Sequence, residues 1–165
     1  MRKITIRKGF QPIPFIISLA ITLAIGFVAS LVTRPQIAGW YSTLNKPSFN
    51  PPAWLFAPVW TAIYLLIAIA AYLVWKRRNL IVGYSTTATI YAVQLLLNFS
   101  WSIVFFGLHQ ILGALIVIVL LWISIILNIA WFGKFNKIAA WLLVPYLLWV
   151  SFATLLNLNI YLLNH

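Results

Sequence analysis

Residues 111–132 read ILGALIVIVLLWISIILNIAWF, a run without one charged side chain. A helix needs about 20 apolar residues to cross the hydrocarbon core of a bilayer, which is roughly 30 Å thick. Four further stretches pass the same test, so we predict five membrane spans at residues 15–33, 54–75, 80–106, 111–132 and 138–162. We therefore expect an all-α integral membrane protein, a single transmembrane domain over residues 1–165 built as a bundle of five helices.

The composition supports a membrane protein and excludes several kinds of chemistry. Hydrophobic residues make up 64% of the chain, against about 45–50% in soluble domains. Asp, Glu and Cys do not occur, which excludes carboxylate-based hydrolysis, carboxylate-held Mg²⁺ or Ca²⁺, Ser-His-Asp triads, thiolate nucleophiles and disulfides. Because only His109 and His165 remain as soft ligands, we expect no metal site and no resident cofactor.

The net charge of +11 reflects topology. Every basic residue lies outside the apolar interiors of the spans, so we expect lipid head groups and not nucleic acid as its partner. Arg34 and Lys46 fall on one side of the membrane, and the other nine fall on the side of the N-terminus: Arg2, Lys3, Arg7, Lys8, Lys76, Arg77, Arg78, Lys134 and Lys137. The positive-inside rule then predicts a cytoplasmic N-terminus and an external C-terminus in a bacterial plasma membrane.

The connection between the first two spans is long, and small residues mark the first span. Residues 34–53 include four prolines and several aromatics, so they cannot be helical throughout, and we expect a lid over one end of the bundle. Ser18, Thr22, Gly26 and Ser30 recur every four residues, a spacing that lets helices approach closely. This stripe serves packing within the chain or a homodimer contact, for which Ala88 and Ala92 in the third span compete.

Nine tryptophans are more than two interfacial belts require. Trp60, Trp101, Trp122 and Trp149 lie deep in the spans, and because an indole N–H needs a partner in hydrocarbon, we expect all four to face the bundle interior. Three helix faces combine aromatic with polar or small residues. These faces carry Trp60 and Tyr64; Gln94, Asn98, Trp101 and Phe105; and Pro145, Trp149, Ala153 and Asn157.

Two interpretations of these faces remain open. In the first, amide side chains hydrogen-bond across the bundle and Trp fills volume, so the faces only hold helices together. In the second, they form the wall of an aromatic pocket with a few polar groups, suited to a flat apolar ligand such as a tetrapyrrole or a sterol. Ala153 favours the pocket because a small residue leaves space beside Trp149. In both, Asn98 and Asn157 are interior residues.

Three blocks of sequence resemble the translocator protein family, also called TspO/MBR, tryptophan-rich sensory proteins or peripheral-type benzodiazepine receptors. They are WYSTLNKPSFNPPAWLFAPVW at residues 40–60, NFSWSIVFF at 98–106 and PYLLWVSFATLLN at 145–157. The resemblance implies a bundle of five helices, often a homodimer, that binds porphyrins, sterols and isoquinoline-type drugs in a pocket closed by the first loop. It places Tyr41, Trp60, Tyr64, Asn98, Trp101, Trp149 and Ala153 in the pocket, and Leu44 and Pro47 in the lid.

The chain departs from the family pattern at a few positions. Phe49 stands where the family usually has Trp, and Ala57 where it usually has Gly. The end of the last span lacks the Lys or Arg of the proposed cholesterol motif, which is itself a weak pattern. We therefore do not expect sterol binding through that motif.

The sequence leaves three functional hypotheses. The first is a receptor or sensor that binds porphyrins such as protoporphyrin IX, whose carboxylates meet Lys46 or Arg34. The second, suggested by the resemblance, is light- and oxygen-dependent degradation of protoporphyrin IX, with Trp60 and Trp149 as candidate catalytic electron donors. The third is facilitated transport of a porphyrin or sterol. Active coupled transport is not expected, because proton-coupled carriers place an ionisable residue at depth and these spans hold none of that kind.

Overall fold

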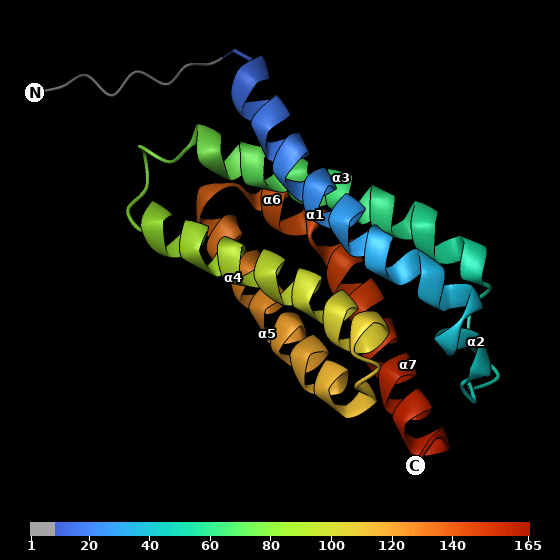
Figure 1. The fold of residues 1–165 in the computed structure, drawn as a ribbon. Helices are drawn as coiled ribbons and strands as arrows, with labels where there is room; N and C mark the ends of the chain where they lie inside the picture. The colour runs from blue at the N-terminus through green and yellow to red at the C-terminus, as the bar shows by residue number, and fades with distance from the viewer. Residues whose placement is uncertain (1–8) are drawn as a thin grey trace, which may run out of the picture.

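The computed structural model describes residues 9–165, and within that range every regular element is a helix (Figure 1). Five helical stretches are long and apolar enough to span a membrane, which confirms the predicted architecture. In chain order the elements are α1 (Pro12–Ala38), α2 (Trp40–Thr43), η1 (Ala53–Leu55), α3 (Phe56–Lys76), α4 (Tyr84–Ser102), η2 (Ile103–Gly107), α5 (Ile111–Phe135), α6 (Lys137–Leu142) and α7 (Val144–Leu163).

Two helix starts differ from the predicted bounds for local reasons. The third span begins at Tyr84, four residues later than predicted, because Gly83 has a φ of 99° in the left-handed region that favours glycine. The first span begins at Pro12, since proline is tolerated in the first turn of a helix. It also continues past Pro35 to Ala38, so the loop between the first two spans is shorter than predicted.

The fifth span is two helices in sequence. Asn136 caps α6, because its side-chain oxygen accepts a hydrogen bond from the Ile138 amide at 2.8 Å. The helix breaks at Leu143, and α7 restarts with Pro145 in its first turn, where a missing N–H costs nothing. The end of α4 widens into the π-helical turn η2, which leaves both Phe105 and Phe106 buried.

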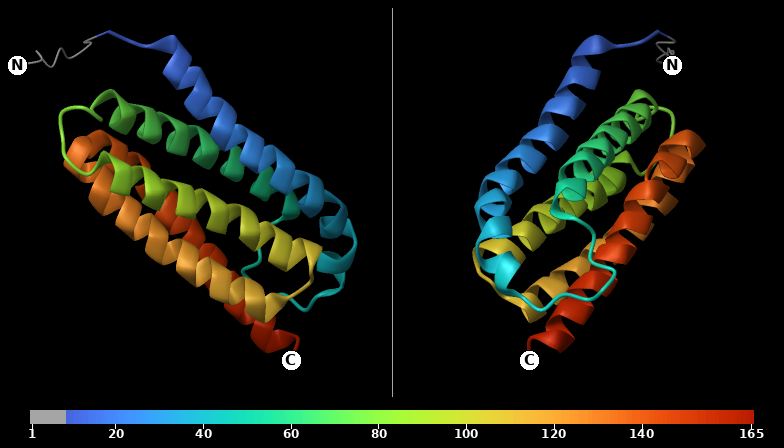
Figure 2. Two further views of the ribbon diagram at one scale, coloured as in Figure 1. Left: turned by 60° about the vertical axis from the view of Figure 1, so that its left-hand side comes forward. Right: turned by 90° about the vertical axis from the view of Figure 1, so that its right-hand side faces the viewer.

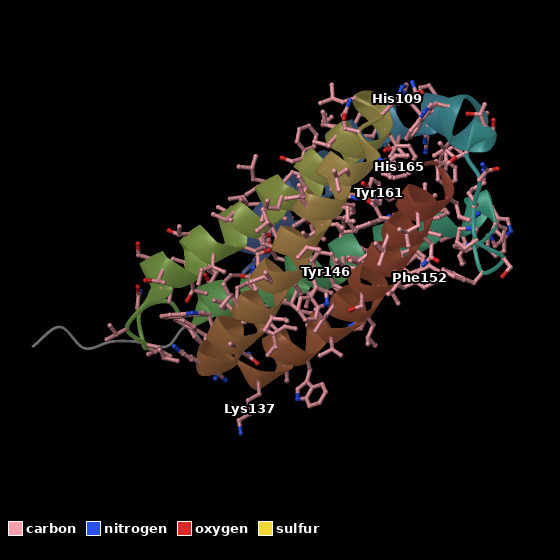
Figure 3. All side chains as sticks on the ribbon, turned by 90° about the horizontal axis from the view of Figure 1, so that it is seen from below. His109, Lys137, Tyr146, Phe152, Tyr161 and His165 are labelled. Atoms are coloured by element: carbon pink, nitrogen blue, oxygen red, sulfur yellow. The ribbon has the colours of Figure 1, made fainter. Side chains whose placement is uncertain are left out.

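Helices α1 and α3 pack together, as do α4 and α5, and α5 and α7 (Figure 2). The start of α1 and the end of α7 lie at opposite ends of the bundle (Figure 1). Lys137 lies at one end, and His109 and His165 lie at the other (Figure 3). At the end that contains Lys137, the Arg77 guanidinium donates to the Phe135 carbonyl at 2.8 Å. This bond joins the end of α3 to the end of α5. Arg2, Lys3, Arg7 and Lys8 lie outside the described residues.

Candidate functional site

A cavity of about 420 Å³ lies between α1, α3, α4, η2 and α7. This volume falls in the range of small-molecule sites in proteins. Apolar side chains make up most of the wall, and Arg34 is its one basic residue. Five elements, α1, α2, α3, α4 and η2, contribute aromatic rings to the wall. These rings belong to Phe27, Tyr41, Phe56, Trp60, Tyr64, Trp101, Phe105 and Phe106.

The cavity wall includes five of the nine pocket and lid residues expected from the sequence, namely Tyr41, Trp60, Tyr64, Trp101 and Ala153. The other four lie outside it, and they are Leu44, Pro47, Asn98 and Trp149. Trp149 packs behind the wall, with its ring centroid 6.0 Å from that of Phe56, and its buried indole N–H has no hydrogen-bond partner.

The aromatic wall is a row of neighbouring rings. The Trp60 and Tyr64 ring centroids are 5.8 Å apart, Trp60 and Trp101 are 6.4 Å apart, and Trp101 and Phe105 are 5.6 Å apart, with interplanar angles of 30°, 31° and 23°. Offset arrangements at these separations are favourable for π-systems. The wall therefore contains a continuous row of indole, phenol and phenyl rings.

A buried hydrogen-bond network behind this wall joins three helices. The Tyr64 hydroxyl of α3 donates to Asn98 Oδ1 of α4 at 2.7 Å. The Asn98 amide donates to the Tyr146 hydroxyl of α7 at 2.9 Å, and Gln94 donates to the same hydroxyl at 2.8 Å. Asn98 thus lies behind the wall and holds the Tyr64 ring in place.

Asn157 supports a second wall residue. Its Oδ1 accepts from the indole N–H of Trp101 at 3.2 Å, and its amide donates to the Ile111 carbonyl at 3.1 Å. Asn98 and Asn157 are each only 2% exposed, which confirms that both are interior residues.

Polar contacts hold the conformation of the loop between the first two spans. The Tyr41 hydroxyl donates to Asn50 Oδ1 at 2.7 Å, and burial raises the pKa of Tyr41 to about 12. The Lys46 ammonium donates to the carbonyls of Tyr41 and Leu44, each at 2.8 Å. Lys46 therefore caps the end of α2, and Arg34 is the basic group on the cavity wall.

Sequence reasoning missed most of the contribution of α1 to the wall. Leu23, Gly26, Phe27, Ala29, Ser30, Thr33, Arg34 and Ile37 all line the cavity. The stripe of small residues drew attention to this face of α1 but did not distinguish packing from a cavity wall. In the structure, a Cβ on Gly26 would collide with the Tyr64 ring. Ser18 and Thr22 of the same stripe pack within the chain, where the Ser18 hydroxyl donates to the Ala68 carbonyl at 2.8 Å.

The prediction that every deep tryptophan faces the interior is wrong for Trp122. Its side chain is 37% exposed on the outside of α5. The indole N–H donates to the Ser151 hydroxyl of α7 at 2.8 Å, so the polar group is satisfied at the surface of the bundle.

Comparisons with known proteins agree with this architecture. The model of the TspO/MBR family matches residues 18–163. The chain is 45% identical to the tryptophan-rich protein TspO of Chlorobaculum tepidum over 93% of its own length and 98% of that protein. It is 45% identical to the protein of the same name from Archaeoglobus fulgidus, over 89% of this chain and 94% of that one. It is 36% identical to the human translocator protein over 92% of both chains. The chain is an integral, multi-pass membrane protein that belongs to the TspO/MBR family.

Proposed function

We propose that the protein is a membrane receptor or sensor that binds porphyrins, such as protoporphyrin IX, and related flat apolar ligands in the cavity. Family membership supports a membrane receptor or sensor role. The observation that carries the proposal is a cavity of about 420 Å³ whose wall combines a row of aromatic rings with one guanidinium, that of Arg34. A planar tetrapyrrole offers a π-face to the rings and carboxylates to the arginine.

Arg34→Gln is expected to weaken protoporphyrin IX binding and to leave a neutral isoquinoline-type ligand nearly unaffected. Because Arg34 is exposed, we expect a loss typical of a solvated ion pair, about 0.2–1 kcal/mol, or up to roughly fivefold in affinity. The difference between the ligands should shrink toward 1 M salt, where the Debye length is about 3 Å. Fluorescence titration of both ligands measures it.

Lys46→Gln is the matched control for this test. The Lys46 ammonium holds carbonyls at the end of α2, so its loss loosens the loop and should affect both ligands alike. If Lys46→Gln selectively weakens porphyrin binding and Arg34→Gln does not, Lys46 recognises the carboxylates and the assignment to Arg34 is wrong.

Light-dependent degradation of protoporphyrin IX is a second candidate function. It is favoured by the neighbouring indoles of Trp60 and Trp101 on the wall, since indoles can donate electrons to an excited porphyrin. Under illumination with oxygen, we expect the porphyrin absorption to fall faster with the protein than without it, and more slowly with Trp60→Phe. Equal rates for all three samples would reject this activity.

We also propose that the N-terminus is cytoplasmic and that the protein lies in a bacterial plasma membrane. The proposal rests on the predominance of Lys and Arg on one side of the spans. Since the chain has no Cys, single cysteines are clean probes. An impermeant thiol reagent added to intact cells should label His165→Cys and spare Arg77→Cys, and the reverse pattern would contradict the orientation.

A further inference from the structure

Helix α1 contacts α3 along its first half and other elements along its second half. Phe15 packs on Tyr72, with ring centroids 5.3 Å apart, and Ser18 donates to the Ala68 carbonyl. After the close approach of Gly26 to Tyr64, α1 turns to different neighbours. Val32 lies against Gly107 of η2, and Gln36 hydrogen-bonds His109 at 3.1 Å. In Figure 1, α1 runs across α3.

The space left between the second half of α1 and the start of α3 belongs to the cavity, and its edges are exposed. On α1, Leu23 and Phe27 line the cavity and are 38% and 64% exposed. On the facing side, Ala53 of η1 and Ala57 and Thr61 of α3 line the cavity and are also exposed. Both segments belong to helices that are long and apolar enough to span the membrane. These edges therefore face lipid acyl chains.

The connection between α1 and α3, in contrast, contains a hydrogen-bonded strap, residues 41–50, of which Tyr41 lines the cavity. The backbone N–H of Asn45 donates to Asn164 Oδ1 at 3.0 Å, and the Asn164 amide donates back to the Asn45 carbonyl at 2.9 Å. This reciprocal pair joins residues that are 119 positions apart. The pair fastens the strap to the end of α7. The Lys46 ammonium and the bond from Tyr41 to Asn50 link residues within the strap itself.

We propose that the ligand enters and leaves the cavity from the bilayer, through a side opening between α1 and α3, while the strap stays closed. The inference rests on the proposed binding function and narrows the ligand class to amphiphiles that partition into the membrane. The apolar body of such a molecule passes between Phe27 and Ala57. Its anionic group ends near Arg34, the basic residue of the cavity wall.

The first experiment locks the strap. In the double variant Asn45→Cys and Asn164→Cys, a short thiol-reactive cross-linker joins the strap to the end of α7, and the untreated variant is its own control. The protein sits in phosphatidylcholine vesicles, and stopped-flow fluorescence follows transfer of protoporphyrin IX. We expect association and dissociation rates within about twofold of the untreated sample. A fall of tenfold or more on cross-linking would overturn the side opening and make the strap the gate.

The second experiment obstructs the side opening. Phe27→Cys carrying a bulky maleimide should slow association and dissociation together, by fivefold or more. Val28→Cys with the same label is the matched control, because Val28 is 45% exposed on the same helix but does not line the cavity. Equal rates for the two labelled proteins would overturn the route. If the unlabelled wild-type chain shows no saturable binding, the proposed function itself fails, which is a distinct result.

Discussion

Ala153→Phe is expected to weaken protoporphyrin IX binding more than any other single change in the wall, by about tenfold or more. Ala153 is buried on α7 and lines the cavity with Leu156 and Asn157. A phenyl ring at this position occupies space that the ligand needs, and overfilling a packed site costs on the order of 1–3 kcal/mol, or roughly five- to 150-fold in affinity. Fluorescence titration of the purified protein in nanodiscs measures the loss.

Ala130→Phe is the control for added bulk. Ala130 is exposed on α5 and does not belong to the cavity wall, so affinity should stay within about twofold of the wild type. Thermal unfolding of both variants separates a filled cavity from a damaged fold. If Ala153→Phe folds normally and binds the porphyrin as well as the wild type, the ligand site lies elsewhere.

Asn98→Leu is expected to give the largest loss of stability. The substitution keeps similar volume but removes the acceptor for Tyr64 and one donor to Tyr146, in a side chain that is only 2% exposed. Leaving a buried hydroxyl without a partner costs about 1–3 kcal/mol. Measured hydrogen bonds between transmembrane helices average about 0.6 kcal/mol each. We therefore expect the decrease in the free energy of unfolding to lie near the lower end of the 1–3 kcal/mol range, at about 1 kcal/mol.

Denaturation in mixed micelles, compared with Asn159→Leu, tests this expectation. The Asn159 amide donates to the Leu155 carbonyl of its own helix at 2.8 Å and joins no other helix, so its replacement should change stability little. Tyr64→Phe combined with Asn98→Leu should destabilise less than the two single changes added together, because both remove the same hydrogen bond. Strict additivity would mean that this bond contributes nothing.

The spans were predictable because long apolar runs such as residues 111–132 permit only one structure in a bilayer, where every backbone group must be satisfied internally. The faces of α3, α4 and α7 were predictable for a similar reason, because helical periodicity puts Trp60 beside Tyr64 and Trp101 beside Asn98. Both pairs lie at or directly behind the cavity wall.

Other features depend on tertiary contacts that no local pattern encodes. The Gly26 position serves equally for helix packing and for a cavity wall, and only the approach of Tyr64 distinguishes them. Lys46 has no Asp or Glu side chain to pair with, and its ammonium is satisfied by carbonyls at the end of α2. Trp122 satisfies its N–H at the outer surface through Ser151, which sequence spacing between two helices cannot show.

The most direct test of the binding proposal is a titration of the protein in nanodiscs with protoporphyrin IX in the dark, followed by tryptophan fluorescence. The row formed by Trp60 and Trp101 should be quenched when a porphyrin lies against it. We predict saturable quenching that a neutral isoquinoline-type ligand reverses and that Ala153→Phe largely abolishes. Quenching that rises without saturation, and equally in Ala153→Phe, would show that the porphyrin only partitions into the membrane and would contradict a binding cavity.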